Sequence, residues 1–307
     1  MTQDMGESGG PLYLTTREVA GLLRVKERKV YDLAAAGEIP HRRITGKLLF
    51  PRSEIHAWIE GGHTAPAAAG AAAEGPRPAV LAGSHDPLLD WAVREAECGL
   101  ATLLNGSHDG LDAFAEGRAA LAGLHIPEDR NGAAGMGWNI RSVEARGLGG
   151  CVLIGWAARA RGLLLARGTG AEVRRLADLR GRRIVLRQPG AGAATLMQRL
   201  LAEAGLGPAD FTAAAGLART ESDAAAAVAS GEAEAALGIE AMARQFDLPF
   251  RPLVAERFDL LVDRRAFFTP PVQRLMAFAR GPRLAEKAAA MGGYDLSGLG
   301  AVRWLSP

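Results

Sequence analysis

Residues 14–60 read LTTREVAGLLRVKERKVYDLAAAGEIPHRRITGKLLFPRSEIHAWIE and carry the clearest local pattern in the chain. Thr15 or Thr16 can cap a first helix, and Glu18 is placed to complete a capping box with Thr15. The apolar residues that follow have the i, i+3, i+4 spacing of one helix face: Val19, Leu22 and Leu23. The stretch therefore begins with an amphipathic helix.

A second helix, a hairpin and a third helix are expected to complete this unit. The second helix is predicted from about Lys26 to Ala36, with Gly37 as its C-cap. The segment IPHRRITGKLLF (39–50) then predicts two short strands that turn at residues 45–47. A short helix capped by Ser53 ends the series, so the predicted order is helix, turn, helix, hairpin, helix.

The pattern resembles the excisionase-type winged helix-turn-helix that is related to the MerR group. The resemblance rests on L-T-x-x-E-V-A-x-L-L in the first helix, V-Y-x-L in the second, a wing that contains glycine, and a final I-x-x-W-I. It implies that the second helix and the wing bind double-stranded DNA. The residues expected to do so are Lys26, Arg28, Lys29, Tyr31, Arg42, Arg43, Thr45 and Lys47.

Composition changes sharply at GGHTAPAAAGAAAEGPR (61–77), which is rich in Ala, Gly and Pro and has no large apolar side chain. Pro and Gly interrupt any helix that the alanines favour, so the segment is interpreted as a flexible linker. The domain boundaries predicted from this are a disordered N-terminus (1–11), a winged helix-turn-helix (12–60), the linker, and a ligand-sensing domain (78–307).

Beyond the linker, apolar runs alternate with helical patterns, which indicates an α/β architecture built from strand-helix units. The runs interpreted as buried parallel strands are residues 79–83, 99–105, 120–126, 182–188 and 233–239. Gly-Ser-His-Asp occurs at 83–86 and again at 106–109, each time just after a predicted strand. Similar groups are therefore expected at equivalent strand ends.

This second part resembles the type II periplasmic-binding-protein-like domain of the molybdate-binding-like branch. The markers include GSHDPLLD (83–90), RQPGAG (187–192) and GGYD (292–295), in that order. The resemblance implies two α/β lobes that close on a ligand, with lobe two at about 170–255. It places the crossover near Gly162 to Gly168 and the return near Glu256 to Asp263.

Ligands of open α/β sheets bind beyond the carboxyl ends of strands, where helices begin and offer free N–H groups to anions. The candidate ligand-binding residues are Ser84, His85, Ser107, His108, His125, Arg187, Gln188, Gly190, Ala191, Gly192, Thr195, Glu221, Ser222 and Glu240. The family turn R-Q-x-G-S-G-T-R is here RQPGAGAAT, so Ala191 and Ala194 replace a hydroxyl and a cation. A ligand larger or less charged than molybdate, stacked on Trp138 or Trp156, is therefore an alternative. The competing interpretation of both tryptophans is packing in a core.

Composition sets limits on the function class. The net charge is only +2, so a DNA-binding surface has to come from local clustering of Lys and Arg. Cys98 and Cys151 lack metal-ligand spacing, and no signal peptide or apolar run long enough to span a membrane is apparent. We therefore expect a cytoplasmic protein that has no membrane association.

No enzyme motif is found, so we expect no catalytic residues. A metal site at His85, His108 and His125 is chemically conceivable, but their spacing fits no compact metal motif, so no metal is expected.

The sequence predicts a one-component transcription regulator that binds operator DNA and senses a small ligand between two lobes. The ligand is either a molybdate- or tungstate-like oxyanion or a larger organic, cofactor-like metabolite. A homodimer or higher homo-oligomer is expected, because DNA half-sites are usually paired. The competing hypothesis is a cytoplasmic ligand-binding or enzyme-like protein whose N-terminal module docks protein rather than DNA.

Overall fold

The computed structural model describes residues 13–23, 25–35, 39–44, 47–60, 76–129, 136–170 and 172–307. Contacts divide the chain into two compact units, Met1–Ala72 and Ala73–Pro307, which are described separately. The segment expected to be a disordered N-terminus, most of the expected linker, and Gly37 and Thr45 lie outside the described residues. None of the described helices is both long and apolar enough to cross a bilayer.

The first unit has the predicted order of elements, with one additional strand. Its elements are β1 (Tyr13–Thr15), α1 (Thr16–Leu23), α2 (Glu27–Ala35), β2 (Arg42–Ile44), β3 (Lys47–Pro51) and α3 (Arg52–Glu60). The unpredicted β1 pairs antiparallel with β3, so the sheet order is β1-β3-β2. The capping box is confirmed, since Thr15 N donates to Glu18 Oε2 at 2.7 Å and Glu18 N donates to Thr15 Oγ1 at 3.4 Å.

In the second unit, lobe one is built on parallel strands β4 (Val80–Gly83), β5 (Ala101–Leu103) and β6 (Leu121–Leu124). Its further elements are α4 (Pro87–Glu95), α5 (Ser107–Ala115), β7 (Pro127–Asp129), β8 (Met136–Trp138), α6 (Ile140–Glu144), α10 (Arg264–Phe267), α11 (Pro270–Ala279), α12 (Pro282–Met291), β14 (Tyr294–Asp295) and β15 (Val302–Leu305). β5 was expected to be buried, but it is exposed because it forms the edge of the sheet.

Lobe two repeats the parallel arrangement with β10 (Arg183–Arg187), β11 (Thr212–Ala218) and β12 (Ala235–Ile239). Its helices are α7 (Gly192–Glu203), α8 (Glu221–Ala229) and α9 (Glu240–Gln245), with short 3-10 turns at Leu176–Leu179 and Pro208–Asp210. Each lobe has a hydrophobic cluster, and Trp138 of β8 packs into the cluster of lobe two. Leu88, Phe258 and Leu275 are buried in lobe one, and Ile184, Leu196 and Leu237 in lobe two.

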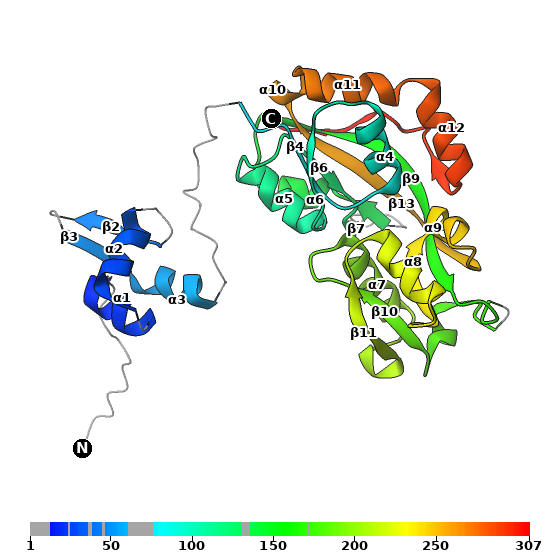
Figure 1. The fold of residues 1–307 in the computed structure, drawn as a ribbon, viewed down its shortest axis with the longest axis horizontal. Coiled ribbons are helices and arrows are strands. Elements are labelled where there is room, and N and C mark those ends of the chain that lie inside the picture. The colour runs from blue at the N-terminus through cyan, green and yellow to red at the C-terminus, as the bar shows by residue number, and fades with distance from the viewer. Residues whose placement is uncertain are drawn as a thin grey trace. The chain divides into compact units, whose positions relative to one another are not determined.

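Two long antiparallel strands, β9 (Cys151–Leu165) and β13 (Phe250–Asp263), run through both lobes (Figure 1). β9 pairs with β15 at Val152–Ile154 in lobe one and with β12 at Arg161–Leu165 in lobe two. The predicted crossover at Gly162–Gly168 is therefore wrong in position, because Gly162 is already paired with Gly238 of lobe two. The chain crosses within the continuous strand β9, between Ile154 and Arg161.

Candidate functional site

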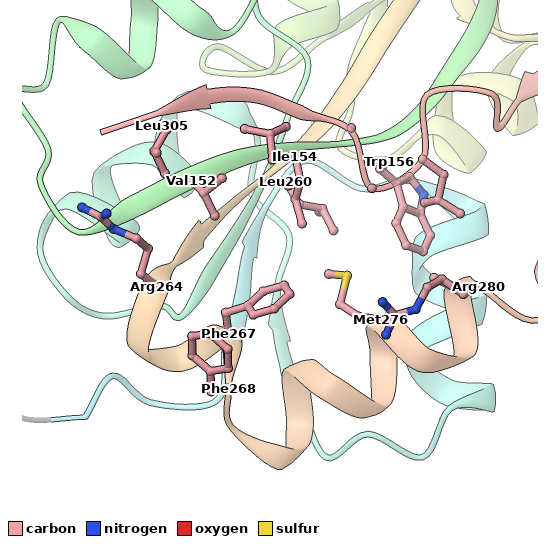
Figure 2. Close-up of a pocket in the computed structure, with 15 residues that line it drawn as sticks. Val152, Ile154, Trp156, Leu260, Arg264, Phe267, Phe268, Met276, Arg280 and Leu305 are labelled. Atoms are coloured by element: carbon pink, nitrogen blue, oxygen red, sulfur yellow. The ribbon is translucent and has the colours of Figure 1, made fainter. Parts of the chain in front are cut away.

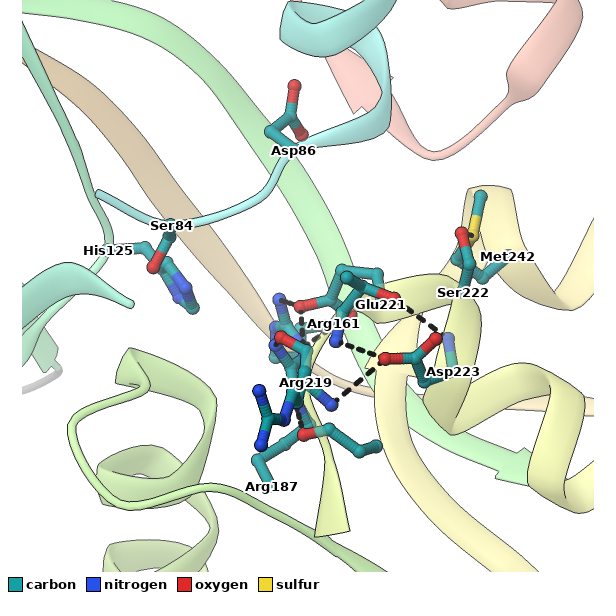
Figure 3. A network of polar contacts seen from close by, with 12 residues as sticks. Ser84, Asp86, His125, Arg161, Arg187, Arg219, Glu221, Ser222, Asp223 and Met242 are labelled. Atoms are coloured by element: carbon teal, nitrogen blue, oxygen red, sulfur yellow. Dashed lines mark hydrogen bonds and ion pairs between the residues drawn. The ribbon is translucent and has the colours of Figure 1, made fainter. Parts of the chain in front are cut away.

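Six charged side chains meet where the crossing strands pass between the lobes, and we call them the junction cluster: Asp86, Arg159, Arg161, Arg187, Glu221 and Glu256. Asp86 follows β4, and Glu221 begins α8 in lobe two. Arg159 and Arg161 lie on β9, which alternates these charges with small residues. Figure 3 shows Arg161, Arg187 and Glu221 gathered together, with Ser84 and His125 on the lobe-one side. Both lobes and both crossing strands contribute to the cluster.

Glu256 on β13 is the centre of the cluster. Its carboxylate accepts a hydrogen bond from Arg159 and another from Arg161 Nη2 at 2.8 Å, and Arg161 Nε lies 2.6 Å from its second oxygen. Arg159 also donates to Asp86 Oδ2 at 2.8 Å. The two guanidinium groups of β9 are thus held by carboxylates from different segments.

Glu221 links the cluster to lobe two. Arg161 holds its carboxylate in a bidentate pair at 2.9 and 3.1 Å, and Arg187 Nη1 donates to the same carboxylate at 2.8 Å. Arg187 also donates to the backbone oxygens of Ala218 and Arg219, at 3.1 and 3.0 Å. These bonds fix the guanidinium plane of Arg187 at the end of β10.

The cluster balances three guanidinium groups against three carboxylates. Burial by itself raises a carboxyl pKa, but Arg161 and Arg187 outweigh it at Glu221 and lower that pKa. At Glu256, Arg159 and Arg161 likewise outweigh burial and hold the pKa well below its usual value. Both carboxylates are therefore ionised at neutral pH, and the cluster has no excess positive charge.

A chain of polar contacts connects the strand ends of lobe one to Glu256. Ser84 Oγ lies 2.8 Å from Ser107 Oγ, which accepts from His125 N at 3.1 Å. His125 Nδ1 lies 3.0 Å from Glu256 Oε2, and because an ionised carboxylate only accepts, Nδ1 carries the hydrogen. Burial lowers the pKa of His125 despite the nearby Glu256, so the ring is neutral at neutral pH.

The lobes also touch directly at the beginnings of α5 and α7. His108 N donates to Gly190 O at 3.2 Å, and Gln188 Nε2 donates to the backbone oxygen of Asn105 at 3.1 Å. A Cβ atom on Gly192 would lie only 2.5 Å from His125 O. This glycine therefore allows a backbone approach that a side chain would prevent.

The structure brings together some of the predicted ligand residues and separates others. Two of them, Arg187 and Glu221, belong to the cluster. Those beside it are Ser84, Ser107, His125, Gln188, Gly190, Ala191 and Gly192. Ser222 instead bonds Met242 Sδ at 3.5 Å, and Glu240 pairs with Arg244 at 2.6 Å. Thr195 lies one turn into α7, where its N–H bonds Ala191 O. Within the described part of the chain, Ser222, Glu240 and Thr195 form no hydrogen bond or ion pair with the junction cluster.

The remaining predicted residues divide in a similar way. His85 follows β4, and its Nδ1 is buried with no hydrogen-bond partner among the described residues. His108 begins α5 and contributes its backbone N–H. In the described part of the chain, no three His, Cys, Asp or Glu residues form a group that could hold a metal ion. Trp138 and Trp156 are buried in the cores of the lobes, as the core-packing interpretation expects.

Sequence reasoning missed four members of the junction cluster as site residues: Asp86, Arg159, Arg161 and Glu256. The signal was present, because the buried strand CVLIGWAARARGLLL (151–165) carries two arginines at i and i+2. Residues two apart point to the same face of a strand, so buried charges at that spacing require shared partners on a neighbouring strand.

In the first unit, the predicted recognition helix exposes its polar face. Lys26, Arg28 and Lys29 are exposed, and Tyr31 is 53% exposed. Arg42 is exposed and pairs with Glu54 at 2.8 Å, so its positive charge is already partly compensated. Thr45 and the side chains of Arg43 and Lys47 lie outside the described residues.

Two family models match the chain. The model of the PBP superfamily domain matches residues 91–280, which is more than half of the 307 residues. The model of a helix-turn-helix domain matches residues 13–63.

One protein is similar to this chain in sequence, and two solved structures are similar to part of it in fold. YvgK of Bacillus subtilis (strain 168) is 26% identical over 262 residues, which cover 81% of this chain and 84% of YvgK. A Clostridium perfringens protein described as a phosphate ABC transporter substrate-binding protein, solved with bound phosphate, is 11% identical with a TM-score of 0.50, over 69% of this chain and 96% of that one. The regulatory domain of MetR, a LysR family regulator from N. meningitidis, is 13% identical with a TM-score of 0.48, over 70% and 97%. At such identities the structural similarity concerns the fold alone.

Proposed function

Because the chain belongs to the PBP superfamily, we propose that it is a ligand-responsive transcription regulator, in which residues 78–307 bind a small molecule and residues 12–60 bind operator DNA. The observation that carries this proposal is the junction cluster, which joins both lobes to both crossing strands. A ligand that binds there with different affinity in two arrangements of the lobes shifts the balance between them. That shift is the signal transmitted to the DNA-binding unit.

The charge balance of the cluster favours a particular class of ligand. Arg159, Arg161 and Arg187 already face carboxylates, so a free dianion would have to compete with Glu221 and Glu256. A small organic molecule that carries both donors and acceptors can bind without leaving a buried charge unpaired. We therefore favour an organic, zwitterionic or neutral metabolite.

A molybdate- or tungstate-like oxyanion is the second candidate ligand. It is favoured by the meeting of the α5 and α7 beginnings, where the backbone of Gly106 closely approaches Gly190. Helix N-termini present free N–H groups to anions, and the hydroxyls of Ser84 and Ser107 lie close by.

A thermal-shift panel separates the two ligand classes. The compounds are molybdate, tungstate, sulfate, and a set of amino acids and nucleosides, tested on the wild type, Arg187→Lys and the control Arg183→Lys on the same strand. We expect an organic compound to raise the Tm of the wild type and of Arg183→Lys, and to raise that of Arg187→Lys by less than half as much, because Lys lacks the bidentate fork. A panel without any shift, or equal shifts in both variants, contradicts the ligand site.

For DNA binding, the exposed first turn of α2 supplies the expected contacts. We expect Arg28→Ala to weaken binding to an operator fragment, selected in vitro from genomic DNA, by roughly tenfold and to flatten its salt dependence. The control Arg174→Ala removes an exposed arginine of lobe two and should leave the affinity within twofold. If no sequence-specific fragment is retained, the N-terminal unit docks protein instead.

We also propose that the regulator acts in the cytoplasm as a homodimer or higher homo-oligomer. A single short winged module supplies few base contacts, and symmetric operators present paired half-sites. Light scattering of the full chain with operator DNA tests this proposal, and a strict monomer on the DNA contradicts it.

A further inference from the structure

Lobe one contains an apolar pocket that shares no residue with the junction cluster. The pocket lies between the sheet strands β9, β13 and β15 and the helices α10 and α11, and its volume is about 540 Å³. Figure 2 shows Ile154, Trp156, Leu260, Phe267 and Met276 arranged around this space. Small-molecule sites are typically apolar hollows of roughly 300–1,000 Å³. The pocket therefore has the size and the walls of a ligand site.

Large apolar side chains stay exposed around the pocket. Phe268 is 78% exposed, Val302 65% and Leu305 55%, and all three line the pocket. Exposed apolar groups that gather at one hollow mark a surface that gains stability when a partner covers it. An apolar molecule seated in the pocket would remove these side chains from water.

The charge around the pocket has one sign. None of its 15 lining residues is acidic, and two of them are arginines, Arg264 and Arg280. Arg264 donates to Ser306 Oγ at 3.2 Å and to Pro307 O at 3.3 Å. Arg280, at the end of α11, is exposed and forms no ion pair or side-chain hydrogen bond with any residue that the structure describes. The Arg280 guanidinium is thus available to an anion.

We propose that this pocket binds an amphipathic carboxylic acid, with its aliphatic or aromatic body against the apolar walls and its carboxylate on Arg280. The apolar walls select for the body, and the unpaired guanidinium selects for a single anionic end group. The site is separate from the junction cluster and does not depend on the proposed regulatory function. A second copy of the chain covering the exposed side chains is the competing occupant.

Displacement of a fluorescent probe tests the proposal on the full chain. The probe is 8-anilinonaphthalene-1-sulfonate, an aromatic body with one anionic group, and the competitors are decanoate and decyltrimethylammonium. We expect saturable probe binding that decanoate displaces and that the cation with the same alkyl chain does not. Equal displacement by both competitors would show that charge plays no part and would overturn the proposal.

Charge reversal on α11 provides the matched variants. Arg280→Glu should weaken decanoate binding by about tenfold, because it replaces an attraction with a repulsion. Arg274→Glu makes the same change at an exposed position of the same helix that does not line the pocket, and it should stay within twofold. Equal affinities for the two variants overturn the proposal. Light scattering gives a second such outcome. If the protein is a dimer that Phe268→Asp converts to monomers, the face is an interface between copies and the proposal is overturned.

Discussion

At the level of single residues, the order of the junction depends on Glu256. Its carboxylate contacts two buried arginines of β9 and the ring of His125. Buried guanidinium groups cannot be neutralised by losing a proton, so each needs a carboxylate within reach. The three carboxylates of the cluster come from segments far apart in the sequence, and they hold the two lobes on the crossing strands. The pairing therefore specifies one arrangement of the junction rather than adding general stability.

Glu256→Gln should expose this dependence. Removing one negative charge leaves Arg159 and Arg161 underneutralised in a buried site, so we expect the free energy of unfolding to fall by about 3–5 kcal/mol. The matched control is Glu172→Gln, which removes the carboxylate of an ion pair with Arg182 whose Glu side chain is 64% exposed. It should cost less than about 1 kcal/mol in the same urea titration. Similar losses for both variants would contradict the buried role of Glu256.

His125 gives the junction a pH dependence of known sign. Its pKa is lowered in the folded protein by burial, so below about pH 6.5 the unfolded chain takes up a proton that the folded chain does not. The free energy of unfolding should therefore fall as the pH drops from about 7 towards the folded pKa, by at most about 1.4 kcal/mol per pH unit from this residue. Urea titrations between about pH 5.5 and 8 measure the slope. His125→Gln should make it shallower, and an unchanged slope would show that the ring titrates freely.

At the level of elements, the sequence predicted five of the six parallel strands described, because each of the five is an apolar run followed by a small-residue turn. It missed β11, whose sequence TAAAGLA has one large apolar residue. The structure places Ser84 and Ser107 at two of those turns and Arg187 at the end of β10, and their role in ligand binding stays a prediction. The sequence did not predict β9 and β13 as continuous crossing strands. Arg159 and Arg161 interrupt the apolar run of β9, and only a three-dimensional arrangement shows that Glu221 and Glu256 compensate them. Partners distant along the chain leave no local pattern.

The contact between the beginnings of α5 and α7 can be tested with one methyl group. Gly192→Ala places a Cβ only 2.5 Å from His125 O, so we expect the lobes to be held apart while each keeps its own core. Hydrogen exchange at the His108 amide, which donates across this contact, should accelerate by roughly tenfold. Gly207→Ala is the control, because its Cβ would meet nothing within 4 Å. Exchange at His108 that is equally slow in both variants would mean that the lobes are not joined there.

At the level of the whole molecule, the chain combines a helix-turn-helix domain with a two-lobed domain of the PBP superfamily. The chain divides into two compact units, so the proposed regulation requires that the state of one unit changes the state of the other. Under the proposed function, a ligand that binds at this charge-balanced junction shifts the balance between two arrangements of the lobes, and the ion pairs of the cluster specify the one described here. A ligand that favours the same arrangement as DNA strengthens operator binding, and a ligand that favours the other arrangement weakens it.

The most direct test of this coupling is the affinity of the full chain for its operator. It is measured by fluorescence anisotropy, with and without a saturating amount of the compound that raises the Tm of the protein. We predict a change of at least about fivefold, matched by an equal factor in the ligand affinity when operator DNA is present, because binding linkage is reciprocal. An operator affinity that stays the same while the ligand site is full would contradict the account.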